Sequence, residues 1–216
     1  MSQKVLIVIG AGPGISLATA KKFGENGATI AFIARRPSSL EAFGAELDHH
    51  GIENQGFIGD AASVSSLREA LQKILTHYDS IDSILYNVSA ATPGKPLELD
   101  PEDIARDFQA NVLGALVAVQ EVVPRMTNGS LLFTGGGLAL NPYPDYASLA
   151  IGKAGLRNLV HSLYQQLQEH GHYVGIVTVK GFVKPGTFYD PKDIAEAFYT
   201  LYTNRDQVEF MFEEPK

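Results

Sequence analysis

The clearest chemical signal in this sequence is a glycine-rich stretch near its start. The stretch lies between a short apolar run, Val5 to Ile9, and a segment whose apolar residues have helical spacing. Small residues at such a turn let the backbone approach a pyrophosphate closely, and the helix N-terminus adds amide donors and the positive end of a dipole. The stretch predicts a dinucleotide-binding loop, the alternative being a tight turn without a ligand. The expected contacts to the cofactor are Gly10, Gly12, Pro13, Gly14 and Ile15.

A second signal is a pair of adjacent arginines, Arg35 and Arg36, at the end of the next apolar run. A cofactor with a free ribose 2′-hydroxyl is usually held by an acidic residue here, and neither Asp nor Glu occurs at this point. Two guanidinium groups instead suit a 2′-phosphate, which accepts charge-assisted hydrogen bonds. We therefore expect NADP(H) in preference to NAD(H). The alternative is that the arginines are solvated loop charges.

The elements that must place these residues follow a regular order. Apolar runs rich in β-branched residues alternate with segments of helical spacing along the chain. The expected strands are Val5 to Ile9, Thr29 to Ile33, Gln55 to Ile58, Ser83 to Tyr86, Ser130 to Thr134, Tyr173 to Val179 and Gln207 to Phe212. The first helix is expected from Ile15, and the others are Ser39 to His49, Val64 to His77, Pro101 to Val123, Asp145 to Glu169 and Pro191 to Tyr202.

Capping residues support several of these boundaries. Asp100 and Asp190 each precede a proline that suits a first helical position. Ser38 with Glu41 has the spacing of a capping box. Gly51 and Gly171 fall where helices commonly end in a left-handed residue.

This alternation predicts the fold. Seven strands separated by six helices imply a mostly parallel sheet covered on both faces, because parallel strands need crossover connections. We predict an α/β, Rossmann-like, doubly wound fold with a seven-stranded sheet. The length of 216 residues suits a single dinucleotide-binding domain over residues 1–216.

Composition excludes several classes of function. A net charge of −7 without a basic run argues against nucleic acid as a partner. The absence of cysteine removes disulfides, thiolate metal sites and a cysteine nucleophile. No metal is expected, because His170 with His172 and Asp48 with the following histidines lack a suitably placed third ligand. The N-terminal apolar run is too short for a signal peptide or a membrane span, so we expect a soluble, cytoplasmic protein with no membrane partner.

The order of motifs from Lys4 to Phe212 resembles that of the short-chain dehydrogenase/reductase family. The glycine stretch is similar to the family's TGxxxGxG, with Ile9 in place of Thr and Ser16 in place of the last Gly. Asp60 resembles the family's Asp that binds the adenine edge, the alternative being a turn or capping residue. The segment from Tyr86 to Ser89 resembles NNAG, and its Asn87 implies support of the cofactor and the central sheet.

The family's catalytic segment is matched only in part. In FTGGGLALNPYPDYASLAIGKAGL, Lys153 matches the Lys that binds the nicotinamide ribose and lowers the pKa of a Tyr four residues earlier. That earlier position is Leu149, and the usual Ser falls in a glycine run around Gly136. Asn111 matches the helical Asn of the family's proton relay. An Asn in an apolar helix face also needs polar partners whatever its role.

Neighbouring groups could take the place of the missing hydroxyls. Tyr146 lies on the same face of the predicted helix as Lys153, about 10 Å along the axis, and it or Tyr143 could reach a substrate. The alternative is a tyrosine packed at a helix start. Thr134 could supply a hydroxyl, and the glycines after it could offer backbone amides to a carbonyl oxygen.

The last motif precedes the final helix. The segment from Lys180 to Thr187 resembles the family's PGxxxT loop, with Lys180 where Pro is usual, and it implies that Gly181 and Val183 contact the cofactor. The helix at Asp190 follows at once, so the usual substrate cover is short and the site is open or completed by a partner chain. The resemblance further implies a homodimer or homotetramer.

Two functions follow from these motifs. The first is an NADP(H)-dependent oxidoreductase acting on a carbonyl or alcohol in a small-molecule substrate, with Lys153 and Asn111 retained and Tyr146 or a water as proton donor. The second is a catalytically silent NADP(H)-binding module that senses the nucleotide or joins an oligomer. Losing a general acid typically costs about 10² to 10⁴ in rate, so the two hypotheses differ in turnover.

Overall fold

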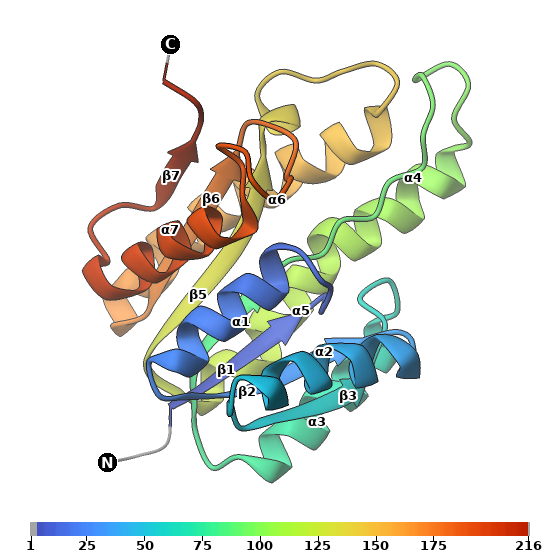
Figure 1. Ribbon diagram of the computed structural model, residues 1–216. Helices are drawn as coiled ribbons and strands as arrows, with labels where there is room; N and C mark the ends of the chain where they lie inside the picture. The colour runs from blue at the N-terminus through green and yellow to red at the C-terminus, as the bar shows by residue number, and fades with distance from the viewer. Residues whose placement is uncertain (1–3, 216) are drawn as a thin grey trace.

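A seven-stranded sheet in the order β3-β2-β1-β4-β5-β6-β7 forms the centre of the computed structural model, which describes residues 4–215 (Figure 1). Each neighbouring pair of strands is parallel. The strands are β1 (Lys4–Ile9), β2 (Ala28–Ala34), β3 (Asn54–Ile58), β4 (Ile81–Tyr86), β5 (Met126–Gly136), β6 (Tyr173–Val179) and β7 (Glu209–Phe212). The predicted doubly wound single-domain α/β fold is confirmed, with a wholly parallel sheet.

Helices cover both faces of this sheet. One face carries α1 (Ile15–Glu25), α2 (Pro37–His49) and α7 (Pro191–Asn204), and the other carries α3 (Val64–His77), α4 (Pro101–Phe108), α5 (Gly114–Val122) and α6 (Ala147–Leu167). Apolar side chains fill a core on each side, represented by Phe198 on the first face and Leu156 on the second. Because both faces are covered, the central strands are apolar throughout rather than alternating.

Local capping chemistry explains most helix boundaries. The carboxylates of Asp100 and Asp190 accept backbone amides in the first turns of α4 and α7, as predicted. Gly51 and Gly171 have φ values of 66° and 79°, which confirms the left-handed positions. The capping box at Ser38 is wrong. Helix α2 begins at Pro37, two residues before the predicted start at Ser39, because proline's fixed φ suits the first helical position and leaves Arg36 at the cap.

Other boundaries shift by a few residues. Strand β5 extends beyond the predicted run at both ends, β7 begins at Glu209 instead of at residue 207, and α6 begins at Ala147 instead of at residue 145. Tyr146 therefore lies at the cap of α6 with φ of −124°, outside the helix. The prediction that it shares a helical face with Lys153 is wrong.

The predicted helix from Pro101 to Val123 is interrupted. Residues Gln109–Leu113 form a π-helical turn between α4 and α5, and Val123–Arg125 form a 3₁₀ turn at the end. The amide of Gly114 donates to the carbonyl of Gln109, five residues back. The hydroxyl of Tyr86, from β4, donates to the carbonyl of Ala110 within this turn. The change of helix type thus coincides with a contact to the sheet. The helical spacing of apolar residues in the sequence does not reveal it.

Candidate functional site

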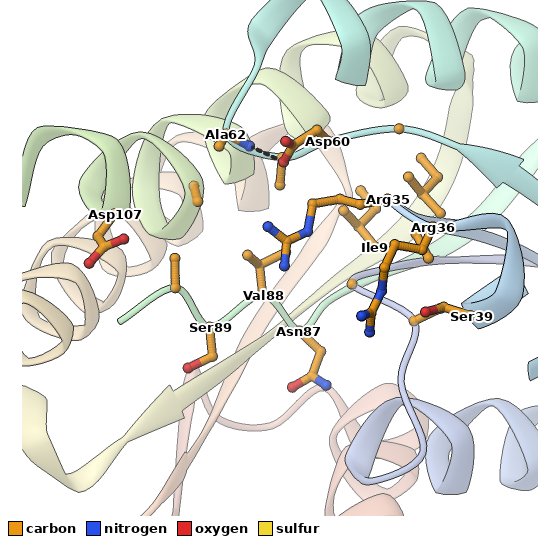
Figure 2. Close-up of a pocket in the computed structure, with 18 of the residues that line it drawn as sticks. Ile9, Arg35, Arg36, Ser39, Asp60, Ala62, Asn87, Val88, Ser89 and Asp107 are labelled. Atoms are coloured by element: carbon orange, nitrogen blue, oxygen red, sulfur yellow. Dashed lines mark hydrogen bonds between the residues drawn. The ribbon is translucent and has the colours of Figure 1, made fainter. Parts of the chain in front are cut away.

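A cavity of about 570 Å³ opens at the carboxyl ends of the strands on one side of the sheet (Figure 2). Open parallel sheets bind ligands at this end, where the strand order reverses. Here that switch point lies between β1 and β4. The lining residues come mainly from the ends of β1 to β4 and from α4: Ile9, Gly10, Ala11, Ile33, Ala34, Arg35, Arg36, Ser39, Gly59, Asp60, Ala61, Ala62, Asn87, Val88, Ser89, Ala90, Ala91, Thr92, Arg106, Asp107 and Ala110.

The glycine loop is fixed to both neighbouring strands. Gly10 has φ of +88°, and a Cβ there would lie 2.6 Å from the carbonyl oxygen of Asn87. The hydroxyl of Ser16 donates to the carbonyl of Gly10 at 2.8 Å and accepts the side-chain amide of Asn87 at 2.6 Å. Ser16, placed where the family's last Gly is expected, therefore joins the loop to the end of β4. This bonded group of Gly10, Ser16 and Asn87 is called the loop lock below.

The outer part of the same loop leaves open space. A Cβ at Gly12 or Gly14 would meet no atom within 4 Å, in contrast to one at Gly10. Gly14 caps α1 without a side-chain hydrogen bond, and no acidic residue occupies the first turn of that helix. Free backbone next to a helix N-terminus suits an anionic group such as a pyrophosphate. The predicted residues Gly12, Pro13, Gly14 and Ile15 thus fit a dinucleotide on steric and electrostatic grounds.

Arg35 and Arg36 direct their guanidinium groups into the cavity, as Figure 2 shows. Both residues are exposed. Within residues 4–215 neither guanidinium is paired with a carboxylate. Two unpaired cations beside an open cavity suit an anionic ligand, and this arrangement supports the proposed contact with a 2′-phosphate.

Asp60 faces the same cavity from the end of β3. Its Oδ1 accepts the amide of Ala62 at 3.0 Å, so the carboxylate also stabilises the turn before α3. Asp60 thus has the role in a turn that was the alternative to an adenine contact. It also lines the cavity, and its contact with adenine stays a prediction.

Lys153 lies buried where β4 and β5 end. Its Nζ donates to the carbonyl of Thr134 at 2.9 Å and to that of Val88 at 3.3 Å. An ammonium has three N–H donors, so one is left by these two bonds. No carboxylate in the described chain is paired with it. Burial lowers the pKa of Lys153 to about 8, so both protonation states of this amine are populated near neutral pH.

Asn111 is fully buried in the π-turn. Its side chain exchanges two hydrogen bonds with the backbone of Ala90: Nδ2 donates to the carbonyl at 2.7 Å and Oδ1 accepts the amide at 2.9 Å. Gly152 on α6 makes room for it, because a Cβ there would lie 2.5 Å from Nδ2. Asn111 thus has the polar partners that its burial demands, and it fixes the segment after β4.

The region around Lys153 offers few hydroxyl groups. The hydroxyl of Thr134 is buried and has no hydrogen-bond partner in the described chain. It therefore lacks the access that a substrate contact would need. Gly136 lies beside the aliphatic stem of Lys153, since a Cβ there would be 3.6 Å from its Cγ. Tyr146 is exposed on the loop before α6, where its ring lies 6.1 Å from that of Tyr143.

The segment from Gly181 to Val183 lies outside the cavity and is exposed. Gly181 packs on the ring of Tyr189, and a Cβ there would lie 2.2 Å from that ring. The hydroxyl of Tyr189 donates to the carbonyl of Lys180 at 3.1 Å, which closes a short loop. The structure does not bring Gly181 and Val183 together with the glycine loop and the arginines, and their contact with a cofactor stays a prediction.

Several cavity residues were not found from the sequence. Ser39, Arg106 and Asp107 line the cavity. Asp107 is buried, and its Oδ2 accepts the amide of Thr92 at 2.6 Å and the hydroxyl of Ser148. This carboxylate therefore joins α4 to the start of α6 and to the loop after β4. A polar residue four positions before Asn111 was the only sequence signal, because the partners of Asp107 are distant in sequence.

The fold and the cavity define a Rossmann-like dinucleotide-binding protein. A family model described as short chain dehydrogenase matches residues 4–191, so the chain belongs to the short-chain dehydrogenase/reductase family. Within this family the chain is an oxidoreductase by type, and a nicotinamide cofactor is typical.

Individual relatives are distant. The oxidoreductase asL5 of Sarocladium schorii is 28% identical over 183 residues, which cover 82% of this chain and 72% of that protein. A metagenomic short-chain oxidoreductase solved with NADP superposes with a TM-score of 0.87 at 22% identity, covering 98% of this chain and 97% of the other. An alcohol dehydrogenase of Thermococcus sibiricus complexed with 5-hydroxy-NADP gives 0.86 at 22% identity and covers 100% of both chains.

Two further observations concern residues 4–215. No helix in this part of the chain is long and apolar enough to cross a membrane. The same residues contain no group of three or more His, Cys, Asp or Glu side chains arranged to hold a metal ion.

Proposed function

We propose that this protein is an NADP(H)-dependent oxidoreductase that interconverts a carbonyl and an alcohol. The observation that carries the cofactor assignment is the pair of unpaired arginines, Arg35 and Arg36, facing the cavity beside the free backbone of the glycine loop. Gly12, Gly14 and Ile15 would hold the pyrophosphate and Asp60 the adenine edge, while the one N–H of Lys153 that its two backbone hydrogen bonds leave over faces the reacting end of the cofactor. When bound, NADP(H) supplies the hydride that a carbonyl carbon takes up, or accepts it from an alcohol.

The protein must still move a proton to or from the substrate oxygen, and we assign this step to Lys153. Leu149 has no proton to give, the Thr134 hydroxyl is covered, and Tyr146 lies outside α6. The pKa of Lys153, about 8, is near the value that suits general acid and base catalysis. In reduction its ammonium donates one proton to the carbonyl oxygen and then takes another from solvent. In oxidation the neutral amine accepts the proton.

Cofactor preference is tested by the dissociation constants of NADPH and NADH for the wild type, Arg35→Ala and Arg36→Ala. Each variant should bind NADPH about tenfold more weakly, because a charge-assisted hydrogen bond is lost, while NADH binding stays unchanged. Lys192→Ala, an exposed cation on α7, is the matched control. An unchanged ratio of the two affinities in both arginine variants would remove the 2′-phosphate contact.

Proton transfer by Lys153 is tested by the pH dependence of carbonyl reduction. The wild-type rate should fall as the pH rises through about 8, because the ammonium loses its proton. Lys153→Arg keeps a positive charge that does not titrate in this range. It should turn over more slowly and without that fall. If Lys153→Arg keeps the wild-type rate and pH profile, another group donates the proton.

A second function has one observation in its favour. Leu149 and Gly136 leave the catalytic segment without the hydroxyl groups that the family usually places there. A silent NADP(H)-binding module would bind the nucleotide and never oxidise it. Wild-type protein that binds NADPH but turns over none of a broad carbonyl panel would support this module over the reductase.

A further inference from the structure

Exposed apolar side chains gather on three loops that follow adjacent strands. Of the eleven large hydrophobic residues that are exposed among residues 4–215, seven lie on the loops after β4, β5 and β6. We call them the apolar rim: Leu97, Leu140, Tyr143, Tyr146, Phe182, Val183 and Phe188. Figure 1 shows these loops at the carboxyl end of the sheet. Concentrated apolar surface of this kind marks a binding site more often than scattered exposure does.

The loops that carry the apolar rim are tied to one another. The amide of Gly94 donates to the carbonyl of Asp145 at 2.9 Å, which joins the loops after β4 and β5. Gly137 packs on the backbone of Lys180, since a Cβ at Gly137 would lie 3.2 Å from its Cα. The three loops therefore form one continuous border.

Internal hydrogen bonds order the loop after β6. In the loop after β6, the amide of Lys184 donates to the carbonyl of Tyr189 at 3.1 Å, and Thr187 Oγ1 donates to the carbonyl of Lys184 at 2.8 Å. Phe182 is nonetheless 90% exposed, and Leu97, in the loop after β4, is 102% exposed. Burial of this exposed phenyl ring against an apolar ligand would be favourable, because it removes apolar surface from water.

Two of the loops that carry the apolar rim begin next to Lys153. The loop after β4 begins beside Val88, whose carbonyl accepts Lys153, and the loop after β5 begins beside Gly136, next to the Lys153 stem. A carbonyl group within reach of this amine would place the rest of its molecule among these loops.

Charge at these loops excludes several substrates. Residues 90–100, 137–146 and 180–190 contain three lysines and four carboxylates, so neither sign predominates. Asp100 and Asp190 cap helices, and Lys180 is paired with Glu213. Lys95 and Lys184 have no carboxylate partner within residues 4–215, but they lie on different loops, whereas the two arginines of the cofactor cavity are adjacent in the chain. A phosphorylated or carboxylate-bearing substrate would find no comparable cationic site.

We infer that the substrate is an uncharged carbonyl compound with a bulky apolar body, such as an aryl or alicyclic ketone, which the apolar rim covers while its carbonyl faces Lys153. This inference rests on the proposed function for the carbonyl and adds the class of the body attached to it. The aromatic side chains of Tyr143, Tyr146 and Phe182 suit flat or cyclic groups, which stack or meet them edge-on.

The test compares reduction by NADPH of acetone, cyclohexanone, acetophenone and 1-tetralone with that of pyruvate and a ketose. The value of kcat/KM should rise about fourfold for each buried methylene equivalent and be lowest for pyruvate and the sugar. Phe182→Ala should raise KM for 1-tetralone about tenfold and leave acetone unchanged. Met211→Ala removes an exposed apolar side chain outside these loops and should change neither value. Preference for pyruvate or the sugar, or equal effects of the two variants, overturns the inference.

A binding measurement separates this inference from the proposed function. Saturation-transfer NMR with acetophenone should detect contact with wild-type protein saturated with NADP⁺, and the signal should weaken in Phe182→Ala. Such binding without turnover of any substrate would reject the reductase function and support an apolar ligand at the rim. Turnover that does not depend on Phe182 would support the reductase function and reject the apolar rim as its substrate site. The molecular mass of both proteins in solution is measured in parallel, and a change of mass in Phe182→Ala would identify the apolar rim as a contact between copies of the chain.

Discussion

Around the glycine loop the polar side chains are joined by hydrogen bonds, whereas near Lys153 a buried hydroxyl group lacks a partner in the described chain. Ser16 makes two hydrogen bonds within the loop lock, and Arg35 and Arg36 line the open cavity beside it. Near Lys153, position 149 is a leucine, and the hydroxyl of Thr134 has no partner in the described chain. The comparison teaches that binding and chemistry can diverge within one fold, because different strand ends supply them.

The largest expected effect comes from adding the two hydroxyl groups that the family resemblance leads us to expect at positions 149 and 136. Leu149→Tyr with Gly136→Ser should raise the rate of carbonyl reduction about 10² to 10⁴-fold, since it returns a positioned proton donor one helical turn from Lys153. The backbone accepts the serine, because Gly136 is extended and its Cβ would only touch the stem of Lys153 at 3.6 Å. The measurement is kcat/KM with NADPH. No gain in a variant that folds and binds NADPH would show that these two hydroxyl groups are not what limits the reaction.

The next effect contrasts two glycines of one loop. Gly10→Ala should destabilise the protein by about 3 kcal/mol, because φ is +88° and the Cβ would lie 2.6 Å from a carbonyl oxygen. Gly14→Ala meets no atom within 4 Å, so its free energy of unfolding should change by less than about 0.5 kcal/mol. Gly14→Ala should still weaken NADPH binding about tenfold, because the new methyl group occupies space meant for the pyrophosphate. Denaturant unfolding and cofactor titration measure the two effects, and full NADPH affinity in Gly14→Ala contradicts the loop assignment.

Lys153 should carry a cost in stability. Lys153→Met should raise the free energy of unfolding by about 2 kcal/mol at pH 7, because it removes a buried cation without a carboxylate partner. The folded pKa of about 8 is below the ordinary value of 10.5. Between these pH values the unfolded chain binds more protons, so wild-type stability rises with pH. The advantage of Lys153→Met should therefore shrink from pH 8 to pH 10.5. An advantage that is constant with pH would mean that the amine is not buried as a cation.

The smallest effect compares two buried hydroxyl groups. Ser16→Ala should cost about 1–2 kcal/mol, because Gly10 and Asn87 each lose a hydrogen-bond partner in the loop lock. Thr134→Val removes a hydroxyl without a partner in residues 4–215 and should be neutral or stabilising. Thermal unfolding measures both. Reduction rates add a second readout, since a loss of activity in Thr134→Val would return that hydroxyl to the catalytic machinery.

The parts that sequence predicted correctly depend on local chemistry. Asp100 and Asp190 cap the first turns of the helices that follow them, and the buried parallel strands are recognisable as apolar runs. The parts that it missed depend on distant partners. Ser16 meets Asn87 across 71 positions, and Asp107 meets Ser148 across 41. Neither pairing has a local period or motif, so a fold was needed to bring the partners together.

The π-turn has a consequence for how the chain can change in length. An α-helix advances about 100° per residue, so deleting one residue from Gln109–Leu113 would restore a regular helix and rotate everything before it relative to α5. Asp107 would then turn away from Ser148 while the side chains of α5 stayed on the sheet. The extra residue therefore sets the rotation of the side chains of α4 relative to those of α5. We expect this segment to tolerate substitution at Leu113, its one exposed position, but no single-residue deletion.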